Sequence, residues 1–408
     1  MAADTPRLPS RFALLWFGQG TSELGSAVSA LALPLVAALA LNAGPAELGW
    51  LGAAVILPWL TALPIGVWID RRPTRPVLIA ADLARAAATC LIPIAWHFGF
   101  LTLPLLYAIA AVLGLGQVFF DTAWGSALPR LVGSGALVQA HSRLEATRSA
   151  TGIAGPGLAG LLIRGVGAAP ALFLDAASFL VSAFSVARAV PRQETAPAAS
   201  HESMATAVKA GLAVVWRQPV LRALVSQAAI WNAVNGATNA LFVLYALQVL
   251  DLDSGGIGVL FMIGGAGAVV GAAAVPVLLR RFAFGPLYLT MVTAACAGFV
   301  LLGGTLPLVA VGQLLIGLGI AVTRVQAVSL RQTVTPVHLL GRTLATYRLL
   351  AFAAIPLGSV LGGLAGARFG LRPALLACAG MAFTALLPLL FSPVRSLRTL
   401  PKITEEGN

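Results

Sequence analysis

The chain has 408 residues, of which 59% are apolar and 10% are charged. Soluble domains usually carry about 25% charged and 45–50% apolar residues, so this composition excludes an ordinary cytosolic enzyme and a disordered protein. The net charge of +12 would suit nucleic-acid binding, but no basic stripe with interleaved aromatic residues accompanies it. The solvent of this chain is therefore largely lipid, and we expect a lipid bilayer but no nucleic acid among its partners.

Apolar runs, separated by glycine, proline or charged residues, predict membrane-spanning helices. A helix that crosses a bilayer needs roughly 20 apolar residues. Twelve runs of that kind follow one another, at residues 12–40, 46–69, 76–97, 102–126, 144–165, 169–190, 219–249, 256–279, 285–304, 307–330, 342–366 and 371–392. We therefore predict an all-α membrane protein with twelve transmembrane helices. The first run is longer than the apolar core of a signal peptide, so we expect it to be an uncleaved span.

The positive charges predict the orientation of these spans. If the N-terminus lies in the cytoplasm, nearly all of the 26 Lys and Arg residues fall in or next to cytoplasmic segments, Arg85 among them. The opposite face then holds only Arg164, Arg368 and Arg372. Because cytoplasmic loops carry an excess of Lys and Arg, we expect both termini in the cytoplasm and a multi-pass protein of the cell inner (plasma) membrane.

The chain divides into two halves that repeat each other. A long polar connection, residues 191–218, separates predicted six-helix bundles at 1–190 and 219–408 and is expected to be a cytoplasmic linker. The sequence LEATR at 144–148 matches LATYR at 344–348, and a proline follows each arginine after eight residues. Two six-helix pseudo-repeats are typical of transporters that rock around a central binding site.

The connection between the second and third spans combines a glycine, an acid and several arginines. It reads GVWIDRRPTR from Gly66 to Arg75, with Asp70, Arg71 and Arg72 at its centre. A glycine permits close helix contact, an acid suits the positive N-terminus of a neighbouring helix, and arginines pair with acids on adjacent spans. These features predict a cytoplasmic gate, and the alternative is a basic loop that only fixes the topology.

The fifth span contains a run of small residues around a proline. It reads GIAGPGLAG from Gly152 to Gly160, with Gly155 and Pro156 at its centre. Proline removes a helix hydrogen bond, and glycines let helices pack closely in membranes. The run therefore predicts a kinked, tightly packed helix.

These two motifs resemble those of a known family. The loop at 66–75 resembles the signature of the major facilitator superfamily, and the run at 152–160 resembles the Gly-Pro motif of its drug antiporters, although a kink without directional meaning is the alternative. Other stretches look like the enterobactin-exporter and macrolide-efflux branch, namely Gly18–Ser26, Ala81–Ala86, Asp175–Phe179 and Gly341-Arg342. The resemblance covers nearly the whole chain and implies the major facilitator fold and proton-driven export of small organic molecules. Glu23 departs from this branch, in which an apolar residue is usual at that position.

Glu23 is the acid placed closest to the middle of the first span. It lies roughly 16 Å into that helix at a rise of 1.5 Å per residue, and Gln19 lies one turn away on the same face. A charge at the bilayer centre is costly and usually functional. We predict that Glu23 takes up and releases a proton, or pairs with a cationic substrate, in a cavity that Gln19 also lines. A structural hydrogen bond is the alternative.

Asp121 and Arg324 occupy matching places in the two halves, each seven residues after the first glycine of a Gly-Leu-Gly sequence. The family resemblance implies that their spans line the transport cavity. We predict a proton-coupling role for Asp121 and a cavity position for Arg324. The two would pair across the closed cavity, or Asp121 would pair with the loop arginines of its own half.

Several further polar residues fall within predicted spans. Asn232, Asn235 and Asn239 share one face of the seventh span, where they would contact a polar substrate or form interhelical hydrogen bonds. Arg148 would reach the lipid headgroups or take part in gating, and Asp175 is expected near the outer start of its helix.

No phosphate-binding loop, hydrolase elbow or zinc-protease motif is present, and the three cysteines match no metal spacing. We therefore predict a monomeric transporter that is not an enzyme and has no metal or cofactor. It would export a small amphipathic organic molecule (a drug, antibiotic or siderophore) in exchange for protons. The alternatives are a lipid or lysolipid flippase, an uptake carrier, and a membrane sensor or assembly partner that does not transport.

Overall fold

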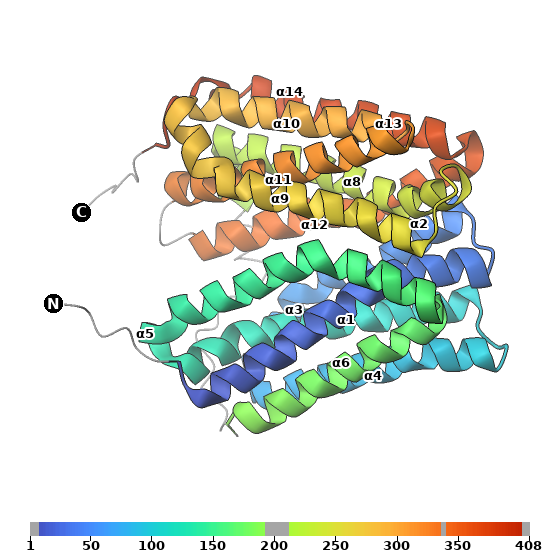
Figure 1. The fold of residues 1–408 in the computed structure, drawn as a ribbon. Helices are drawn as coiled ribbons and strands as arrows, with labels where there is room; N and C mark the ends of the chain where they lie inside the picture. The colour runs from blue at the N-terminus through green and yellow to red at the C-terminus, as the bar shows by residue number, and fades with distance from the viewer. Residues whose placement is uncertain (1–7, 192–211, 336–339, 402–408) are drawn as a thin grey trace. The chain divides into compact units, whose positions relative to one another are not determined.

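The computed structural model describes residues 8–191, 212–335 and 340–401 (Figure 1). Within these ranges the elements are helices, and no β-strand occurs. The all-α prediction is confirmed. Most of the predicted linker, at 192–211, lies outside the described residues.

The first half of the chain forms five long helical segments. They are α1 (Ser10–Ala40), the consecutive elements α2 (Pro45–Ile56), η1 (Leu57–Thr61) and α3 (Ala62–Ile69), then α4 (Thr74–His97), α5 (Leu103–Val166) and α6 (Ala168–Ala189). The short 3-10 segment η1 interrupts the second predicted span just after its middle, and Pro58 sits at its start.

The element α5 contains two spans that the sequence predicts as separate helices, 102–126 and 144–165. The backbone is helical through this region and departs from helical geometry at Gly133, where φ is 72° and ψ is 164°. Glycine adopts a positive φ without steric cost, so one residue breaks the helix between the two spans. The two predicted spans are therefore separate helices, and both extend as far as Gly133.

The second half of the chain forms the helices α8 (Pro219–Gln248), α9 (Ser254–Arg281), α10 (Phe284–Leu301), α11 (Leu306–Val334), α12 (Leu340–Phe369), α13 (Leu371–Thr384) and α14 (Leu386–Leu390), followed by η3 (Pro393–Ser396). The last predicted span, 371–392, is thus divided between α13 and α14.

Ten segments of the described chain are long and apolar enough to cross a membrane. The two other predicted spans, 144–165 and 219–249, are also helical and correspond to the second part of α5 and to α8. Their lower apolar content reflects polar side chains such as Glu145, Arg148 and Asn232. The chain is a multi-pass membrane protein.

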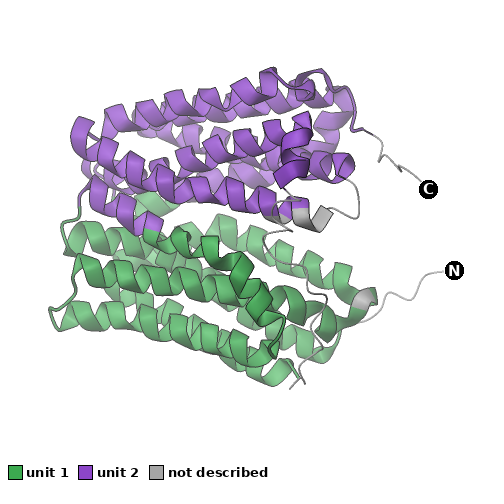
Figure 2. Ribbon diagram, turned by 180° about the vertical axis from the view of Figure 1, so that it is seen from behind, with its two compact units in different colours: residues 1–43, 54–200, 253–259 green, residues 44–53, 201–252, 260–408 purple. Residues whose placement is uncertain are grey.

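Two compact units divide the chain (Figure 2). Unit 1 comprises 1–43, 54–200 and 253–259, and unit 2 comprises 44–53, 201–252 and 260–408. The division into two six-helix bundles, 1–190 and 219–408, stays a proposal.

Within unit 1, α6 packs along both α1 and α4, and α5 packs along α1 and α4. Within unit 2, α8 packs along α12, and α10 packs along α11. Tyr245, Tyr288 and Phe242 are among the largest fully buried side chains, and they lie in the core of unit 2.

Glycines of α1 let this helix approach α6 closely. A Cβ atom at Gly18 would collide with the Ser185 hydroxyl, and a Cβ atom at Gly25 would collide with Ser178 and lie 2.5 Å from a carboxylate oxygen of Asp175. Gly18 and Gly25 are two turns apart, as are Ser185 and Ser178 on the antiparallel partner. The contact therefore brings together two of the stretches that carry the family resemblance, Gly18–Ser26 and Asp175–Phe179.

Candidate functional site

The acid of the first span forms an ion pair inside unit 1. Arg148 Nε donates to Glu23 Oε1 at 2.9 Å, joining α1 to the second part of α5. The Arg148 side chain is 53% exposed and that of Glu23 is 36% exposed, so protein covers neither group completely. The sequence does not predict this partner, because it assigns Arg148 to the headgroups or to a gate, and the proton-coupling role of Glu23 stays a prediction.

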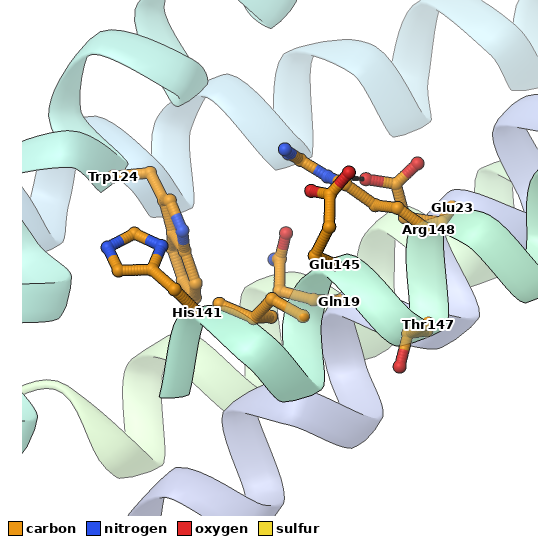
Figure 3. Close-up of a pocket in the computed structure, with 9 residues that line it drawn as sticks. Gln19, Glu23, Trp124, His141, Glu145, Thr147 and Arg148 are labelled. Atoms are coloured by element: carbon orange, nitrogen blue, oxygen red, sulfur yellow. Dashed lines mark hydrogen bonds and ion pairs between the residues drawn. The ribbon is translucent and has the colours of Figure 1, made fainter. Parts of the chain in front are cut away.

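The pair borders a cavity of about 90 Å³ (Figure 3). Its remaining lining residues come from α1 and α5 and are Gln19, Gly20, Trp124, His141, Leu144, Glu145 and Thr147. Gln19 thus lies beside Glu23 at the cavity, and its contact with a substrate stays a prediction.

The walls of this cavity are held together by contacts between α1 and α5. Trp16 Nε1 donates to Thr147 Oγ1 at 2.8 Å, and a Cβ atom at Gly20 would lie 3.2 Å from the Thr147 methyl carbon. Residue 20 is small and Trp16 bonds to Thr147, so α1 and α5 lie close together here. Arg148, which follows Thr147 on α5, therefore lies opposite Glu23.

Asp121 belongs to a second polar network in unit 1. Gln117 Nε2 donates to Asp121 Oδ1 at 2.9 Å, and Gln117 Oε1 accepts from Arg85 Nη1 at 2.5 Å. Arg85 also forms an ion pair with Asp82, one turn before it on α4. Asp121 therefore contacts a neutral amide, whereas Arg85 directly neutralises Asp82.

These positions correct two sequence-based expectations. Arg85 is not a cytoplasmic charge: its side chain is 3% exposed, and its guanidinium lies 4.8 Å from the ring centre of Phe120 and 4.3 Å from that of Phe179. Asp121 does not pair with the loop arginines, since no ion pair of the described residues joins it to Arg71, Arg72 or Arg75. The amide of Gln117, one turn before Asp121 on α5, occupies that place instead.

The embedded charges of unit 1 do not balance. Asp82 pairs with Arg85, and Glu23 pairs with Arg148, whereas no ion pair among the described residues joins Asp121 to a cation. Asp121 lies within electrostatic range of Arg148, Arg85 and Glu23. An ionised carboxylate without a directly bonded cation is costly within the membrane.

The loop predicted as a gate is largely exposed in the described structure. Asp70, Arg71 and Arg72 are exposed, and Arg72 lies 4.7 Å from the ring centre of Trp68. Arg75 Nη2 donates to the carbonyl oxygen of Ala187 at the end of α6, at 2.5 Å.

Gly66 does not make the close helix contact that the sequence predicts. A Cβ atom there would lie 3.7 Å from Thr122, which is an ordinary van der Waals distance. The observed contacts tie Arg75 to unit 1, and the gating role of the loop stays a proposal.

The small-residue run of the fifth span is close-packed at two of its glycines. A Cβ atom at Gly155 would lie 2.8 Å from Ala27 of α1, and one at Gly160 would lie 3.1 Å from Gly258 at the start of α9. Nothing lies within 4 Å of a Cβ atom at Gly152. Pro156 lies within the second part of α5, after the break at Gly133.

The asparagines of the seventh span make two kinds of contact, and their role in binding a substrate stays a prediction. Asn232 Nδ2 donates to the carbonyl oxygen of Ala351 on α12 at 2.9 Å, which is an interhelical hydrogen bond. Asn239 is exposed and donates to Asn235 at 3.2 Å along the same helix. Arg324 is exposed on α11. Asn235, Asn239 and Arg324 therefore present polar groups at the surface of unit 2.

No group of three or more His, Cys, Asp or Glu side chains that would hold a metal ion occurs in the described part of the chain. Cys296 and Cys378 are buried free thiols, and Cys90 is half-buried. The polar sites of unit 1 in the described residues consist of ion pairs and amides.

A family model described as transmembrane secretion effector matches residues 4–405. The chain belongs to this major facilitator family. It is 29% identical over 380 residues to the multidrug efflux pump Tap of Mycolicibacterium fortuitum, covering 89% of this chain and 91% of that protein. It is 24% identical over 249 residues to macrolide efflux protein A of Streptococcus pyogenes, covering 59% and 60% of the two chains.

The fold agrees with this membership. The crystal structure of the nucleoside transporter NupG aligns with a TM-score of 0.78 at 12% identity, covering 93% of this chain and 99% of that one. The resemblance predicted from the loop and the Gly-Pro run is therefore confirmed, and this major facilitator protein is a membrane transporter rather than an enzyme.

The residues of this transporter that the sequence did not predict as site residues are Arg148, Gln117 and the Asp82–Arg85 pair. A local signal exists for Gln117, because it precedes Asp121 by four residues and such positions face each other on a helix. The spacing of Asp82 and Arg85, three residues apart, carries a similar signal. No local signal exists for the contact of Glu23 with Arg148, which are 125 residues apart.

Proposed function

We propose that this transporter exports a small amphipathic organic molecule in exchange for protons. The observation that carries the proposal is the Glu23–Arg148 ion pair, which lies at the border of a cavity and within electrostatic range of Asp121. The direction of transport is supported by the similarity to proteins named as efflux pumps. The cargo class includes drugs, antibiotics and siderophores.

The exchange begins with the protonation of Glu23 in the proposed cycle. A proton on Glu23 removes its negative charge and so weakens the bond to Arg148. The freed guanidinium then turns toward Asp121, whose charge already acts on it. A cationic group of the cargo that enters the cavity has the same effect, since it competes with Arg148 for Glu23. Proton and cargo thus exclude each other, which is the requirement for antiport.

Other parts of the chain take supporting roles in this proposal. The two bundles, 1–190 and 219–408, alternate access to the cavity around the linker 191–218. The loop from Gly66 to Arg75 closes the cytoplasmic side, and the close packing at Gly155 and Gly160 supports the opposite side. Asn235, Asn239 and Arg324 contact the cargo from the second half.

The proposed location is the plasma membrane, with both termini in the cytoplasm and a monomer as the working unit. The distribution of Lys and Arg supports this orientation. Energy comes from the proton gradient.

An efflux panel in a host that lacks its own pumps tests the function. Cells that express the wild-type chain are compared with cells that express Glu23→Gln, using ethidium, tetracycline and a macrolide, with and without an uncoupler. We expect lower accumulation of at least one compound in wild-type cells, and loss of this effect with the uncoupler. Unchanged accumulation of every compound would contradict drug export and favour a lipid flippase, an uptake carrier or a sensor.

A further inference from the structure

The side-chain amide of Gln19 lies between the cavity and a buried polar network that the proposed exchange does not use. On one side, Gln19 lines the cavity together with Glu23 and Glu145. On the other side, its Nε2 donates to Ser182 Oγ on α6 at 3.2 Å. An amide carries an acceptor oxygen and a donor nitrogen on the same carbon, so the partner on the buried side decides which of the two atoms is turned to the cavity.

The Ser182 hydroxyl fixes the orientation of this amide. Ser182 and Asp82 are both 0% exposed. Arg85 occupies Oδ1 of Asp82, and no hydrogen bond of ordinary geometry reaches the buried Oδ2 from the described residues. The Ser182 hydroxyl acts on this carboxylate as a donor. A serine hydroxyl has one hydrogen, and a carboxylate attracts it more strongly than a neutral amide does. Ser182 therefore accepts from Gln19, which requires the NH2 group on its side.

The carbonyl oxygen of Gln19 is consequently turned to the cavity. Figure 3 shows this oxygen on the side where Glu145 and the Glu23–Arg148 pair lie. Glu145 forms no ion pair with another residue of the described chain. The cavity thus presents a neutral acceptor and two carboxylates, and its carboxylates outnumber its guanidinium.

An ammonium group with N–H donors matches this arrangement. A primary ammonium group has three donors and no acceptor, so it can bond to a carboxylate and to the Gln19 oxygen at the same time. Its bonds to carboxylates are charge-assisted and therefore strong. A quaternary ammonium group carries the same charge but no N–H. It would displace water from the Gln19 oxygen without replacing the hydrogen bond, which is unfavourable.

We propose that this cavity selects a primary or secondary ammonium group over a quaternary one, with Gln19 as the specificity-determining residue and Ser182 and Asp82 as positioning residues that orient its amide. The cargo class is then an amphipathic amine. The export of such an amine rests on the proposed function, whereas its selective binding does not.

Two fluorescent probes of equal charge test the selection on the purified full chain in detergent micelles. Dansylcadaverine carries a primary ammonium group, and its N,N,N-trimethyl derivative carries a quaternary one on the same frame. Saturable binding is followed by dansyl anisotropy at pH 7, where an aliphatic amine is protonated. We expect the wild type to bind the primary amine about ten-fold more tightly. Equal affinities, or no saturable binding of the primary amine, would overturn the proposal.

Substitutions of Gln19 test the acceptor. Gln19→Leu removes the oxygen and should reduce the preference for the primary amine to less than about three-fold. Gln19→Glu keeps acceptor oxygens at this position and should retain the preference. The proposal is wrong if Gln19→Leu keeps the preference of the wild type. Should Gln19→Leu fail to fold, loss of the preference in Gln19→Glu would contradict the proposal equally.

Substitutions on α6 test the orientation of the amide. Ser182→Ala frees the Gln19 amide to turn, so the preference should also fall below about three-fold. Ser185→Ala is the matched control, because the Ser185 hydroxyl donates to the backbone carbonyl of Ser182 and not to the amide. A general loss of stability would weaken the binding of both probes alike and leave their ratio unchanged. The same ratio in Ser182→Ala and Ser185→Ala would refute the positioning role.

The binding assay and the efflux panel fail independently. If the primary amine is preferred and no panel compound is exported, the proposed function is wrong and the amine site stands. If panel compounds are exported and both probes bind equally, export stands and the selection of amines is wrong.

Discussion

Replacing Asp82 by Asn should destabilise unit 1 strongly, because it leaves a buried guanidinium without its counter-charge. Arg85 is 3% exposed and Asp82 is fully buried. Removing one partner of a buried ion pair typically costs about 3–5 kcal/mol. Arg85 would keep its hydrogen bond to Gln117 and its contacts with two aromatic rings. Each such cation–π contact stabilises by about 0.5–2 kcal/mol, so we expect a loss near the lower limit, about 3 kcal/mol.

Unfolding of the purified protein in mixed micelles, followed by tryptophan fluorescence, measures this loss. Asp251→Asn, in an exposed loop, is the matched control and should change the free energy of unfolding by less than about 0.5 kcal/mol. The double variant Asp82→Leu/Arg85→Met should be more stable than Asp82→Asn, since apolar pairs of similar volume often replace buried ion pairs without loss. A value for Asp82→Asn within about 1 kcal/mol of the wild type would refute the reasoning and imply that another acid neutralises Arg85.

Two further substitutions test the helix contacts. Gly160→Ala should lower the thermal stability in detergent, because its Cβ atom would collide with the backbone of Ser254, whereas Gly152→Ala should not, and equal effects of the two would contradict the packing. Asn232→Ala should reduce the free energy of unfolding by about 1 kcal/mol through loss of its interhelical hydrogen bond. Asn239→Ala should leave stability unchanged and alter which panel compounds are exported. If Asn239→Ala lowers stability and Asn232→Ala only alters which compounds are exported, Asn239 has the structural role and Asn232 contacts the cargo.

The helices and the family follow from the sequence because both depend on local patterns. Because lipid is the solvent, spanning helices are visible in the sequence as long apolar runs. The loop from Gly66 to Arg75 is visible as a continuous motif. The break in α5 is less predictable: Gly133 ends helical geometry at a single residue, and nothing in the apolar pattern distinguishes that from a loop.

The site is only partly predictable because its partners come from distant parts of the chain. Glu23 and Asp121 stand out as acids in apolar runs, but their partners depend on how α1, α4 and α5 pack. The distribution of positive charges along the sequence predicts Arg85 on the cytoplasmic side. In the structure Arg85 is buried, because Asp82 and two aromatic rings surround its guanidinium. The sequence likewise predicts Asp175 near a helix start. Its burial against α1 depends on the space that Gly25 leaves, and Gly25 is 150 positions earlier in the chain.

Transport in inside-out vesicles tests the central claim, that Glu23 couples protons to export, most directly. With a compound that the panel identifies as exported, an imposed pH gradient should drive uptake into wild-type vesicles. Glu23→Gln should abolish this uptake at an unchanged amount of protein in the membrane, because Gln neither binds a proton nor pairs with the cationic group of the compound. Uptake driven by the pH gradient at the wild-type rate in Glu23→Gln vesicles would contradict the account.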